Sequence, residues 1–416
     1  MTEPYTGIKG SRGDELAGRR IGLCVTGSVA AFHAPEIARE LIRHGAEVVS
    51  VLSNGAQSLI QPELMRWATQ NDPVTVITGR MEHIRLTEEE PERLSLVLIA
   101  PASANTLSKI ASGVSDTPVT LLASCAIGAG IPIVTAPSMH SSLWANPVVQ
   151  SNLERLRSLG VETLSPLVSE GKAKMTSVTN IVEAVIRRLT PKDMEGLRVM
   201  VTAGPTYEQI DPVRLITNRS SGKMGFALAQ DALRRGANVT IVSGPSALTP
   251  PSSAEIIPVE TTREMAEIVA EQLKETKFNL FLAAAAPSDF RPVEPSSAKI
   301  SSRTERPLEL KLEATEKVVD QVKHLQPSIF LITFKAEWNK NRGEMIERAK
   351  VLVEESGADM VAVNNVAVKG TGFGADQNQV ILVKKNGTTI DIPLDLKQVV
   401  AHKILDAYLE ASHKKQ

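Results

Sequence analysis

The stretch that decides the fold is GPTYEQIDPVRLITNRSSGKMG, residues 204–225. It follows a short apolar run over 197–202 and leads into a helical pattern over 226–235. A glycine-rich connection between a strand and a helix exposes backbone N–H groups and a helix N-terminus, which together favour phosphate or another anion. The connection also carries four polar side chains beyond the needs of a tight turn: Arg214, Asn218, Arg219 and Lys223. We therefore predict an anion-binding loop rather than an ordinary strand–helix turn.

The two halves of the chain repeat one plan. The stretch RHGAEVVSVLS, which ends at Ser53, reads like RRGANVTIVSG, which ends at Gly244, and residues 94–105 read like residues 278–289. The first half begins with a predicted strand at 20–26, a turn at 27–28, a helix that ends at Leu41 and a second strand at 47–52. The second half begins with a predicted strand at 198–202, the long connection at 204–225, a helix that ends at Leu233 and a second strand at 238–242. Short apolar runs that alternate with helical periodicity predict βαβ units and parallel sheets.

The predicted fold class is therefore α/β, with two doubly wound domains (Rossmann-like or flavodoxin-like) whose sheets are mostly parallel. Pro191 and Gly196 interrupt the pattern between the halves, so we place the boundary there. The expected organisation is a flexible, polar N-terminal extension over 1–18, a first domain over 19–190 and a second domain over 191–416.

Composition narrows the function classes. The 416 residues carry a formal net charge of −1, without a Lys/Arg run typical of a nucleic-acid or membrane surface. No apolar stretch approaches the roughly 20 residues that span a bilayer, and no signal peptide is expected. Cys24 and Cys125 lie in apolar contexts without a CxxC pair, so we expect a reducing cytoplasm, no disulfide and no structural zinc.

In doubly wound sheets, ligands bind beyond the carboxyl ends of the strands, at the point where the strand order reverses. A dinucleotide site would need G-x-G-x-x-G and an acidic residue closing the second strand. Neither half has both, because Ser53 and Gly244 stand where the acid belongs. NAD is therefore not expected.

Four segments of the first half carry candidate chemistry: TGSVAAF (26–32), MEHIRL (81–86), PASANT (101–106) and PSMHSSLW (137–144). Any one alone fits helix capping or turn formation. Together they resemble the homo-oligomeric flavin-containing cysteine decarboxylases, the family that includes phosphopantothenoylcysteine decarboxylase. The resemblance implies that FMN oxidises the cysteinyl thiol to a thioaldehyde, that CO₂ then leaves to give an enethiolate, and that the reduced flavin returns a hydride equivalent.

The resemblance also implies roles for individual residues. His83 matches the active-site histidine, a base or proton carrier, although a surface histidine at a loop end is the alternative. Asn105 is expected near the flavin, the substrate and a neighbouring subunit. The residues expected to contact FMN are Gly27, Ser28, Ser53, Pro101, Ala102, Ser103, Ala104, Asn105 and Thr106.

Two departures from the family pattern concern the substrate. The asparagine expected to hold the substrate carboxylate is replaced by His140, which can still donate a hydrogen bond. The substrate-clamp segment, residues 170–175, lacks the cysteine that protonates the enethiolate in many members. Lys172, Lys174 or water must then deliver that proton, unless the two lysines are only solvated loop charges. Cys24 and Cys125 read as small core residues and are not assigned this role.

The second half resembles phosphopantothenate–cysteine ligase over nearly its whole length. The matching segments are AGPTYEQIDPVR (203–214), ITNRSSGKMG (216–225), RRGANVTIVSGP (234–245), AAAPSDFRP (284–292), the spacing from Asp289 to Lys299, and TGFGADQN (371–378). The family implies that CTP activates phosphopantothenate as an acyl-cytidylate, which the cysteine amine then attacks. Negative charge accumulates on phosphate oxygens, so catalysis should depend on cations and oriented donors.

By resemblance, Lys299 meets the triphosphate, Asn218 holds the acyl-cytidylate and Arg214 contacts substrate. Phe334 is either core or a surface on which cytosine stacks. Mg²⁺ is expected because it bridges phosphates, and Asp289 is a possible ligand, or else orients the ribose or base. The residues expected at the nucleotide are Gly204, Ser243, Ala285, Ala286, Asp289, Lys299, Phe334 and Lys350.

The nucleotide preference rests on segments that depart from the family pattern. Residues 314–317 and 334–338 both differ from the usual motifs near the nucleotide, and CTP is still favoured over ATP. With His140 and the missing cysteine, these departures favour an archaeal form of the enzyme.

The combined expectation is a bifunctional enzyme of coenzyme A biosynthesis that acts on small molecules: 4′-phosphopantothenate, cysteine and CTP. Two alternatives remain: a binding protein, since some relatives of the flavin domain regulate phosphatases, and a flavin prenyltransferase-like enzyme or peptide-cysteine decarboxylase. Retention of His83 disfavours the first, and fusion to a ligase disfavours the second. The resemblance further implies a homo-oligomer with trimeric decarboxylase and dimeric ligase contacts, possibly a dodecamer.

Overall fold

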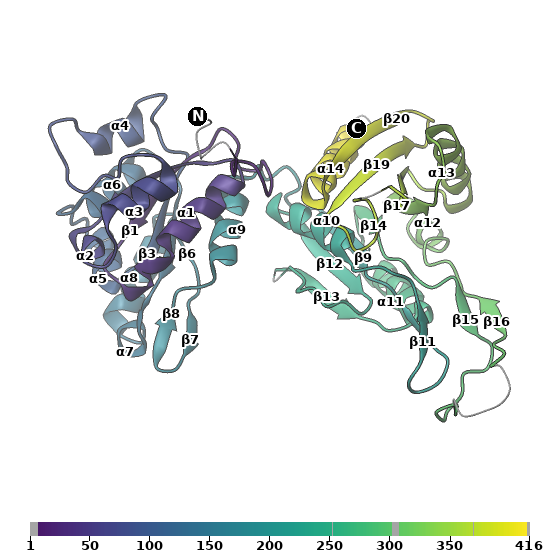
Figure 1. The fold of residues 1–416 in the computed structure, drawn as a ribbon. Helices are drawn as coiled ribbons and strands as arrows, with labels where there is room; N and C mark the ends of the chain where they lie inside the picture. The colour runs from purple at the N-terminus through teal and green to yellow at the C-terminus, as the bar shows by residue number, and fades with distance from the viewer. Residues whose placement is uncertain (1–6, 252, 302–307, 369, 414–416) are drawn as a thin grey trace. The chain divides into compact units, whose positions relative to one another are not determined.

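The computed structural model describes residues 7–251, 253–301, 308–368 and 370–413. The chain divides into two compact units, residues 1–190 and 191–416 (Figure 1). Each unit holds a central sheet with helices on both faces. The α/β fold class predicted from the sequence is confirmed.

The first unit is built on a five-stranded parallel sheet in the order β2-β1-β3-β4-β6. This is the flavodoxin-like order, which reverses direction between β1 and β3. The strands are β1 (Arg20–Val25), β2 (Glu47–Leu52), β3 (Leu96–Ala102), β4 (Ile133–Pro137) and β6 (Glu162–Thr163). The helices are η1 (Val29–His33), α1 (Ala34–Arg43), α2 (Asn54–Gln57), α3 (Pro62–Thr69), α4 (Glu82–Glu88), α5 (Ala104–Ala111), α6 (Pro118–Gly128), α7 (Ser141–Trp144), α8 (Pro147–Ser158) and α9 (Val178–Leu189).

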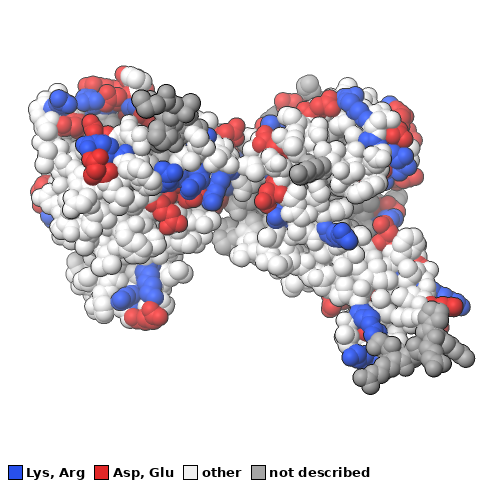
Figure 2. All heavy atoms as spheres, viewed as in Figure 1, with Lys and Arg blue, Asp and Glu red and all other residues white. Residues whose placement is uncertain are grey.

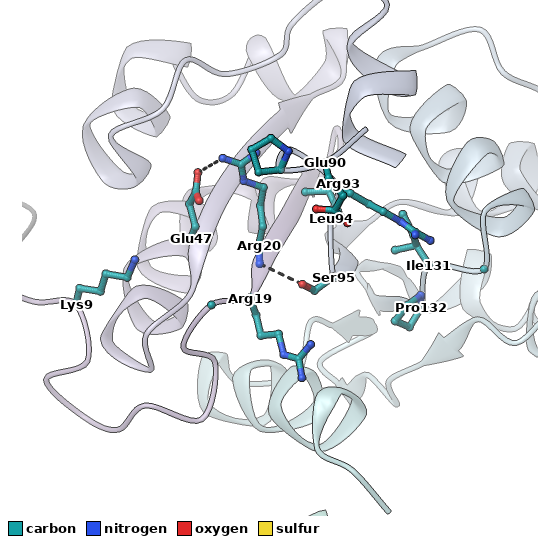
Figure 3. Close-up of a pocket in the computed structure, with 13 residues that line it drawn as sticks. Lys9, Arg19, Arg20, Glu47, Glu90, Arg93, Leu94, Ser95, Ile131 and Pro132 are labelled. Carbon is teal, nitrogen blue, oxygen red and sulfur yellow. Dashed lines mark hydrogen bonds and ion pairs between the residues drawn. The ribbon is translucent and has the colours of Figure 1, made fainter. Parts of the chain in front are cut away.

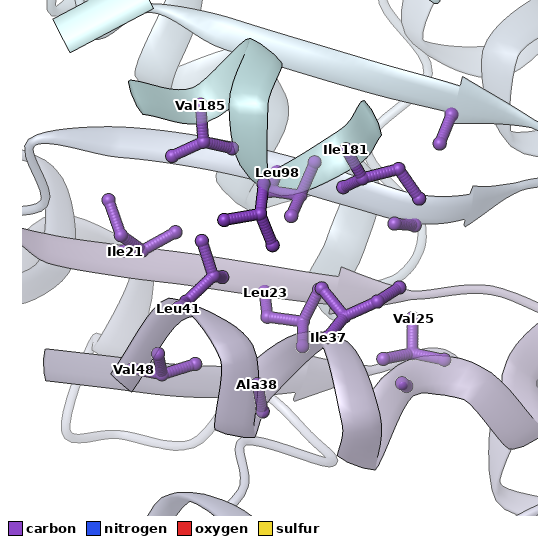
Figure 4. Close-up of a cluster of buried hydrophobic side chains, with 14 of the residues drawn as sticks. Ile21, Leu23, Val25, Ile37, Ala38, Leu41, Val48, Leu98, Ile181 and Val185 are labelled. Atoms are coloured by element: carbon purple, nitrogen blue, oxygen red, sulfur yellow. The ribbon is translucent and has the colours of Figure 1, made fainter. Parts of the chain in front are cut away.

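Alternation along β1 explains why both faces of this sheet are covered. Ile21 and Leu23 face α1 and α9 in one apolar cluster, whereas Cys24 belongs to the cluster on the opposite face. Figure 4 shows Ile37 of α1 and Ile181 of α9 meeting the sheet from this first side. Each fully buried leucine or isoleucine contributes about 1.5–3 kcal/mol of transfer free energy.

The second unit has an eight-stranded sheet in the order β13-β12-β9-β14-β17-β18-β19-β20. It is parallel from β13 to β18, and the last two strands are added antiparallel. The strands are β9 (Arg198–Ala203), β12 (Asn238–Ser243), β13 (Glu255–Pro258), β14 (Leu280–Ala283), β17 (Phe330–Glu337), β18 (Met360–Asn365), β19 (Gln377–Lys384) and β20 (Thr389–Leu396). The helices are α10 (Lys223–Arg234), α11 (Thr262–Glu275), α12 (Val322–Leu325), α13 (Arg342–Ser356) and α14 (Lys397–His413).

The decisive stretch 204–225 differs from the simple loop that the sequence suggests. It contains an antiparallel ribbon of β10 (Tyr207–Gln209) and β11 (Leu215–Thr217). Asp211 closes its turn by accepting the N–H groups of Val213 at 2.8 Å and Arg214 at 2.7 Å. A second ribbon pairs β15 (Phe290–Pro292) with β16 (Leu312–Ala314). Strands of three residues are too short to show a period-two pattern, so the sequence does not reveal them.

The predicted flexible extension over 1–18 is wrong for residues 7–18, while residues 1–6 lie outside the described residues. Leu16 is fully buried in the first apolar cluster. The N–H of Gly10 donates to Ile42 O at 3.1 Å, and the N–H of Leu16 donates to His44 O at 2.9 Å. The segment therefore satisfies carbonyl groups that α1 leaves open at its C-terminus.

A buried arginine holds the second unit together. Arg235, at the end of α10, is 1% exposed, and its guanidinium lies 3.0 Å from Asp231 and 2.5 Å from Asp406 of α14. Asp193, just after the boundary between the units, lies 3.6 Å away. This cluster joins α10, α14 and the first residues of the unit.

We expect Arg235→Leu to destabilise this unit by about 3–5 kcal/mol, because removing the arginine leaves the buried carboxylate of Asp231 without its guanidinium partner. The measurement is hydrogen exchange of the α10 and α14 backbone amides, which should accelerate by about 100-fold or more. Arg342→Leu is the matched control, because the Arg342–Asp391 pair is exposed on both sides. Equal effects of the two substitutions would contradict the role given to Arg235.

The same cluster makes stability depend on pH through His402. A hydrogen bond to Asp231 raises the pKa of His402, while burial and the neighbouring Arg235 oppose the shift. A raised folded-state pKa stabilises the fold fully below the unfolded value of about 6.5, and this contribution disappears as pH rises through the folded value.

We therefore expect the difference in urea midpoint between the wild type and His402→Gln to be largest near pH 5.5. It should shrink steadily toward alkaline pH. A difference that stays constant, or that grows with pH, would rule out this linkage.

Candidate functional site

The first unit gathers its predicted residues at the carboxyl ends of β1, β2 and β3. Thr26, fully buried after β1, donates its hydroxyl to Pro101 O at 2.8 Å and accepts the N–H of Ser103 at 2.9 Å. This hydroxyl joins the two strand ends between which the sheet order reverses. It therefore fixes the geometry of the predicted flavin-binding edge.

Close contact between two glycines shapes the same edge. A Cβ on Gly27 would lie 3.1 Å from Gly55 Cα, and a Cβ on Gly55 would lie 3.2 Å from Gly27 Cα. Ser28 donates to Ser138 Oγ at 3.0 Å, so the ends of β1 and β4 are also connected. Side chains larger than glycine would push the two loops apart.

The other predicted flavin residues divide into capping groups and backbone positions. Ser53 and Ser103 cap α2 and α5 by accepting the N–H groups of Ala56 at 3.2 Å and Thr106 at 3.3 Å. These two hydroxyls therefore cap helices, which is the alternative role that the sequence left open for them. Asn105 is exposed in the first turn of α5, while four of its neighbours are buried: Pro101, Ala102, Ala104 and Thr106.

His83 is half-buried on α4. Its Nδ1 is fully shielded from solvent and has no hydrogen-bond partner within the described part of the chain. Ser141 Oγ, in the residue after His140, is also shielded from solvent and has no hydrogen-bond partner among the described residues. Leaving such atoms unpaired costs about 1–3 kcal/mol each, so each is a polar atom that a ligand or a second subunit can satisfy. No hydrogen bond or ion pair among the described residues joins His83 to the strand ends that carry the other predicted flavin residues. The residues present therefore fit a bound flavin and substrate.

The clamp segment forms a small antiparallel sheet in the order β5-β8-β7, made of β5 (Met139–His140), β8 (Lys172–Lys174) and β7 (Leu167–Ser169). His140 lies directly opposite Lys172, and Lys172 lies opposite Ser169. Lys174 is ion-paired with Glu170 at 2.5 Å. The structure therefore brings His140 and Lys172, two predicted substrate residues, together.

Neither cysteine is placed to replace the missing clamp thiol. Cys24 is fully buried within β1, and burial raises the pKa of its thiol to about 12. Cys125 lies on α6, and burial together with Glu88 raises its pKa as well. Both thiols are free, and neither is readily converted to the reactive thiolate.

The second unit repeats the arrangement of the first. Thr202, near the end of β9, accepts the N–H of Ala285 at 3.3 Å, and Ala286 donates its N–H to Gly204 O at 2.9 Å. Gly204 has a φ of 79°, in the left-handed region that favours glycine. Ser243, at the end of β12, donates its hydroxyl to Gly244 O at 2.9 Å.

The ribbon of the decisive stretch holds the segment that carries Lys299. Arg214 bonds Asp211 at 2.8 Å and Ile300 O at 3.1 Å, and Asp211 also accepts the N–H of Ile300 at 3.1 Å. Burial opposes ionisation of Asp211, but the N–H groups of Val213, Ile300 and Arg214 hold its pKa below the ordinary value. Lys299 itself is exposed, and among the described residues no hydrogen bond or ion pair engages its Nζ.

Asn218 connects the same stretch to the end of β14, because its Nδ2 donates to Pro287 O at 2.8 Å and Ala286 O at 3.3 Å. Three of the predicted nucleotide residues, Gly204, Ala285 and Ala286, therefore lie around Asn218. Asp289 forms an ion pair with Lys317, which belongs to the segment 314–317 that the resemblance placed near the nucleotide.

Two predicted nucleotide residues are less closely joined to this group. Phe334 packs against the apolar cluster beneath α10 and α14, in keeping with the core alternative. Lys350, on α13, pairs with Glu347 of its own helix at 2.7 Å. The structure does not bring Lys350 into contact with Lys299 or Asn218.

The TGFGAD loop is attached to the start of α10, a connection that sequence reasoning missed. Lys223 donates to Gly374 O at 2.9 Å and pairs with Asp376 at 2.6 Å. Lys397, at the start of α14, donates to Ala375 O at 2.6 Å. Burial lowers the pKa of Lys397 to about 8, and the positive charge of Lys223 adds to this shift. The motif TGFGADQN marked this loop in the sequence, but no motif surrounds Lys397, so the sequence did not indicate that Lys397 lies beside the loop.

A pocket of about 470 Å³ lies elsewhere, at the amino ends of the first unit's strands. Figure 3 shows the Arg20 side chain turned toward Glu47 at the pocket wall, while the Arg20 backbone N–H donates to Ser95 Oγ. None of the predicted site residues lines it. It lies at the sheet edge opposite the predicted chemistry.

Broader features of the structure are consistent with small-molecule chemistry. On the face shown in Figure 2, acidic and basic side chains are interspersed on each unit. No helix among the described residues is long and apolar enough to cross a membrane. Within the same residues, no group of three or more His, Cys, Asp or Glu side chains is arranged to hold a metal ion.

Known proteins resemble this chain over nearly its whole length. Residues 9–190 match the family model described as Flavoprotein, and residues 194–411 match the DNA/pantothenate metabolism flavoprotein C-terminal domain. A coenzyme A biosynthesis bifunctional protein CoaBC from Thermococcus kodakarensis is 45% identical over 400 residues, covering 96% of this chain and 97% of its own. A protein of the same name from Methanocaldococcus jannaschii is 34% identical over 387 residues, covering 92% of each chain. The crystal structure of the C-terminal domain of a CoaBC protein is 32% identical, covers 54% of this chain and 99% of its own, and has a TM-score of 0.45.

Proposed function

The chain belongs to the family of coenzyme A biosynthesis bifunctional proteins, and we propose that it makes 4′-phosphopantetheine in two steps at two sites. The second unit joins 4′-phosphopantothenate to cysteine at the expense of CTP, and the first unit decarboxylates the product. The observation that carries the proposal is that the motif residues of each half gather at the carboxyl edge of that half's own sheet.

In the second unit the proposed chemistry depends on charge. Phosphopantothenate attacks the α-phosphorus of CTP, pyrophosphate leaves, and the amine of cysteine then attacks the acyl-cytidylate. Lys299 has no described partner, so its ammonium group is available to meet the triphosphate and the charge that develops on it. Asn218 already donates to two carbonyl groups, which holds its amide in a fixed orientation beside the intermediate. Arg214 positions the Lys299 segment through Ile300.

In the first unit, FMN is the proposed cofactor, and when bound it supplies the electron acceptor for oxidation of the cysteinyl thiol. The glycine pair Gly27 and Gly55 lets the loops that follow β1 and β2 pack against each other, and Ser28 and Asn105 lie at the rim. His83 presents an unpaired Nδ1 that can accept or return a proton near the substrate. His140 and Lys172 face the substrate carboxylate.

Mg²⁺ is proposed to arrive with the nucleotide, since phosphate oxygens supply most of its ligands in such sites. Asp289 remains a possible protein ligand, although it is paired with Lys317. A cytoplasmic homo-oligomer is also proposed, with a flavin site completed by a second subunit. The unpaired Nδ1 of His83 and the exposed Val29 and Phe32 of η1 support this assembly.

An assay of the purified protein with phosphopantothenate, cysteine and each nucleoside triphosphate tests the proposal. We expect CMP, pyrophosphate and CO₂ with CTP, from a yellow protein whose bound flavin is FMN. Lys299→Gln should lower CMP release by at least about 100-fold and leave decarboxylation of supplied phosphopantothenoylcysteine intact. His83→Asn should have the opposite effect.

Lys277→Gln is the matched control, because Lys277 is exposed and precedes β14 at the amino edge of the sheet. It should leave both steps unchanged. A protein that binds no flavin, or one in which Lys299→Gln and His83→Asn impair both steps equally, would contradict the assignment of two sites.

A further inference from the structure

A row of three polar side chains crosses the clamp sheet. His140 of β5 lies opposite Lys172 of β8, which in turn lies opposite Ser169 of β7. Directly opposed residues of antiparallel strands have Cβ atoms about 4.5–5.5 Å apart and share one face. The next residue of β8, Ala173, is fully buried and faces the unit's interior. The row therefore occupies the outward face of the clamp, where all three residues are exposed.

Charge pairing distinguishes the two clamp lysines. Lys174 is held by Glu170, and this hydrogen bond keeps the pKa of the Glu170 carboxyl below its usual range. Lys172 has no hydrogen-bond or ion-pair partner among the described residues. Lys172 is thus the clamp cation free to meet an anionic substrate beside His140.

The ring of His140 is oriented by the turn that follows it. Its Nδ1 caps α7 by accepting the N–H of Ser142 at 3.4 Å and lies 3.1 Å from Ser142 Oγ. An imidazole nitrogen that accepts an N–H carries no proton in the neutral ring, so that proton lies on Nε2. When the ring is charged, Ser142 Oγ is the nearby acceptor for Nδ1–H. Nε2–H therefore remains available to donate a hydrogen bond to a ligand, on the side of the ring away from the N-terminus of α7.

The chemistry of the proposed decarboxylation fixes where a proton is needed. Loss of CO₂ from the thioaldehyde leaves an electron pair delocalised over the former α-carbon and the sulfur. Protonation at that same carbon restores the thioaldehyde, which a hydride from reduced flavin converts to the thiol. A side chain that binds the departing carboxylate therefore lies next to the carbon that is protonated afterwards.

We propose that His140 is the proton donor that replaces the missing clamp cysteine, an inference that rests on the proposed decarboxylase function. His140 Nε2–H first holds the substrate carboxylate, with Lys172 balancing its charge. After CO₂ has left, the Nε2–H bond of the charged ring breaks and a C–H bond forms at the former α-carbon, and the neutral ring then keeps its one proton on Nδ1, next to Ser142 Oγ. Two electrons then return as hydride from the reduced flavin, so the overall reaction is redox-neutral. Asparagine at this position binds a carboxylate but has no proton to give.

Single turnovers of the flavin-loaded protein with phosphopantothenoylcysteine, without oxygen, test this role. We expect His140→Asn to release CO₂ within about 10-fold of the wild-type rate and to slow formation of the saturated thiol by about 100-fold. The enethiol should accumulate, as measured by mass spectrometry, and the flavin absorbance should stay bleached because the hydride is not returned. Lys172→Met should weaken substrate binding but leave the ratio of the two thiols unchanged.

Two further measurements separate proton donation from a structural role. Adding Ser169→Cys to His140→Asn places a thiol in the same cross-strand row, and it should restore the saturated thiol. Solid-state NMR of ¹⁵N-histidine-labelled protein, with His140→Asn to assign the signal, should show a proton on His140 Nε2 before turnover, with or without flavin.

Outcomes that overturn this inference differ from those that overturn the proposed function. Enethiol accumulation in Lys172→Met rather than in His140→Asn, or a resting His140 ring without a proton on Nε2, would exclude His140 as the donor. A wild-type protein that releases no CO₂ would instead exclude the decarboxylase function itself.

Discussion

In both units a buried threonine hydroxyl holds together the ends of the two strands between which the sheet reverses its order. Thr26 bridges β1 and β3, and Thr202 bridges β9 and β14. Each hydroxyl accepts the N–H of a residue just past the second strand, Ser103 in one case and Ala285 in the other. Because an unpaired buried N–H is costly, this single bond fixes where the chain leaves the sheet. Every candidate loop at these edges begins from that fixed point.

The two units place different chemistry on this shared frame. In the first, glycines and short hydroxyl side chains follow the strand ends, and the contact between Gly27 and Gly55 lets the two loops at this edge pack tightly. In the second, the connection lengthens into a ribbon that carries Arg214 and Asn218 and holds the Lys299 segment. Under the proposed function, the same topological position serves electron transfer in one unit and phosphate chemistry in the other, as expected when function resides in loops grafted on a fold.

The central strands and their order of appearance were predictable from the sequence because short, continuous apolar runs alternate with helical periodicity. β2 spans Glu47–Leu52 as predicted, and α10 begins at Lys223, three residues earlier than predicted. The ribbons were missed because strands of three residues show no periodicity. Residues 7–18 were misjudged because their polar composition conceals backbone hydrogen bonds to the end of α1.

The grouping of motif residues at strand ends was predictable from the sequence, whereas contacts between residues far apart in the chain were not. Nothing in the sequence joins Asp289 to Lys317, 28 positions apart, or Lys397 to the TGFGAD loop. The loss of the clamp cysteine was visible in the sequence. That His140 and Lys172 lie side by side follows only from the strand register.

The most direct test of the account exchanges the two threonines for valine, one at a time, and measures bound FMN and CTP affinity in each variant. Thr26→Val leaves the Ser103 N–H unpaired, so the account predicts loss of bound FMN with unchanged CTP affinity. Thr202→Val should weaken CTP binding and leave the flavin content intact. If either substitution reduces both quantities together, or neither quantity responds, the two switch points are not the sites of the two reactions.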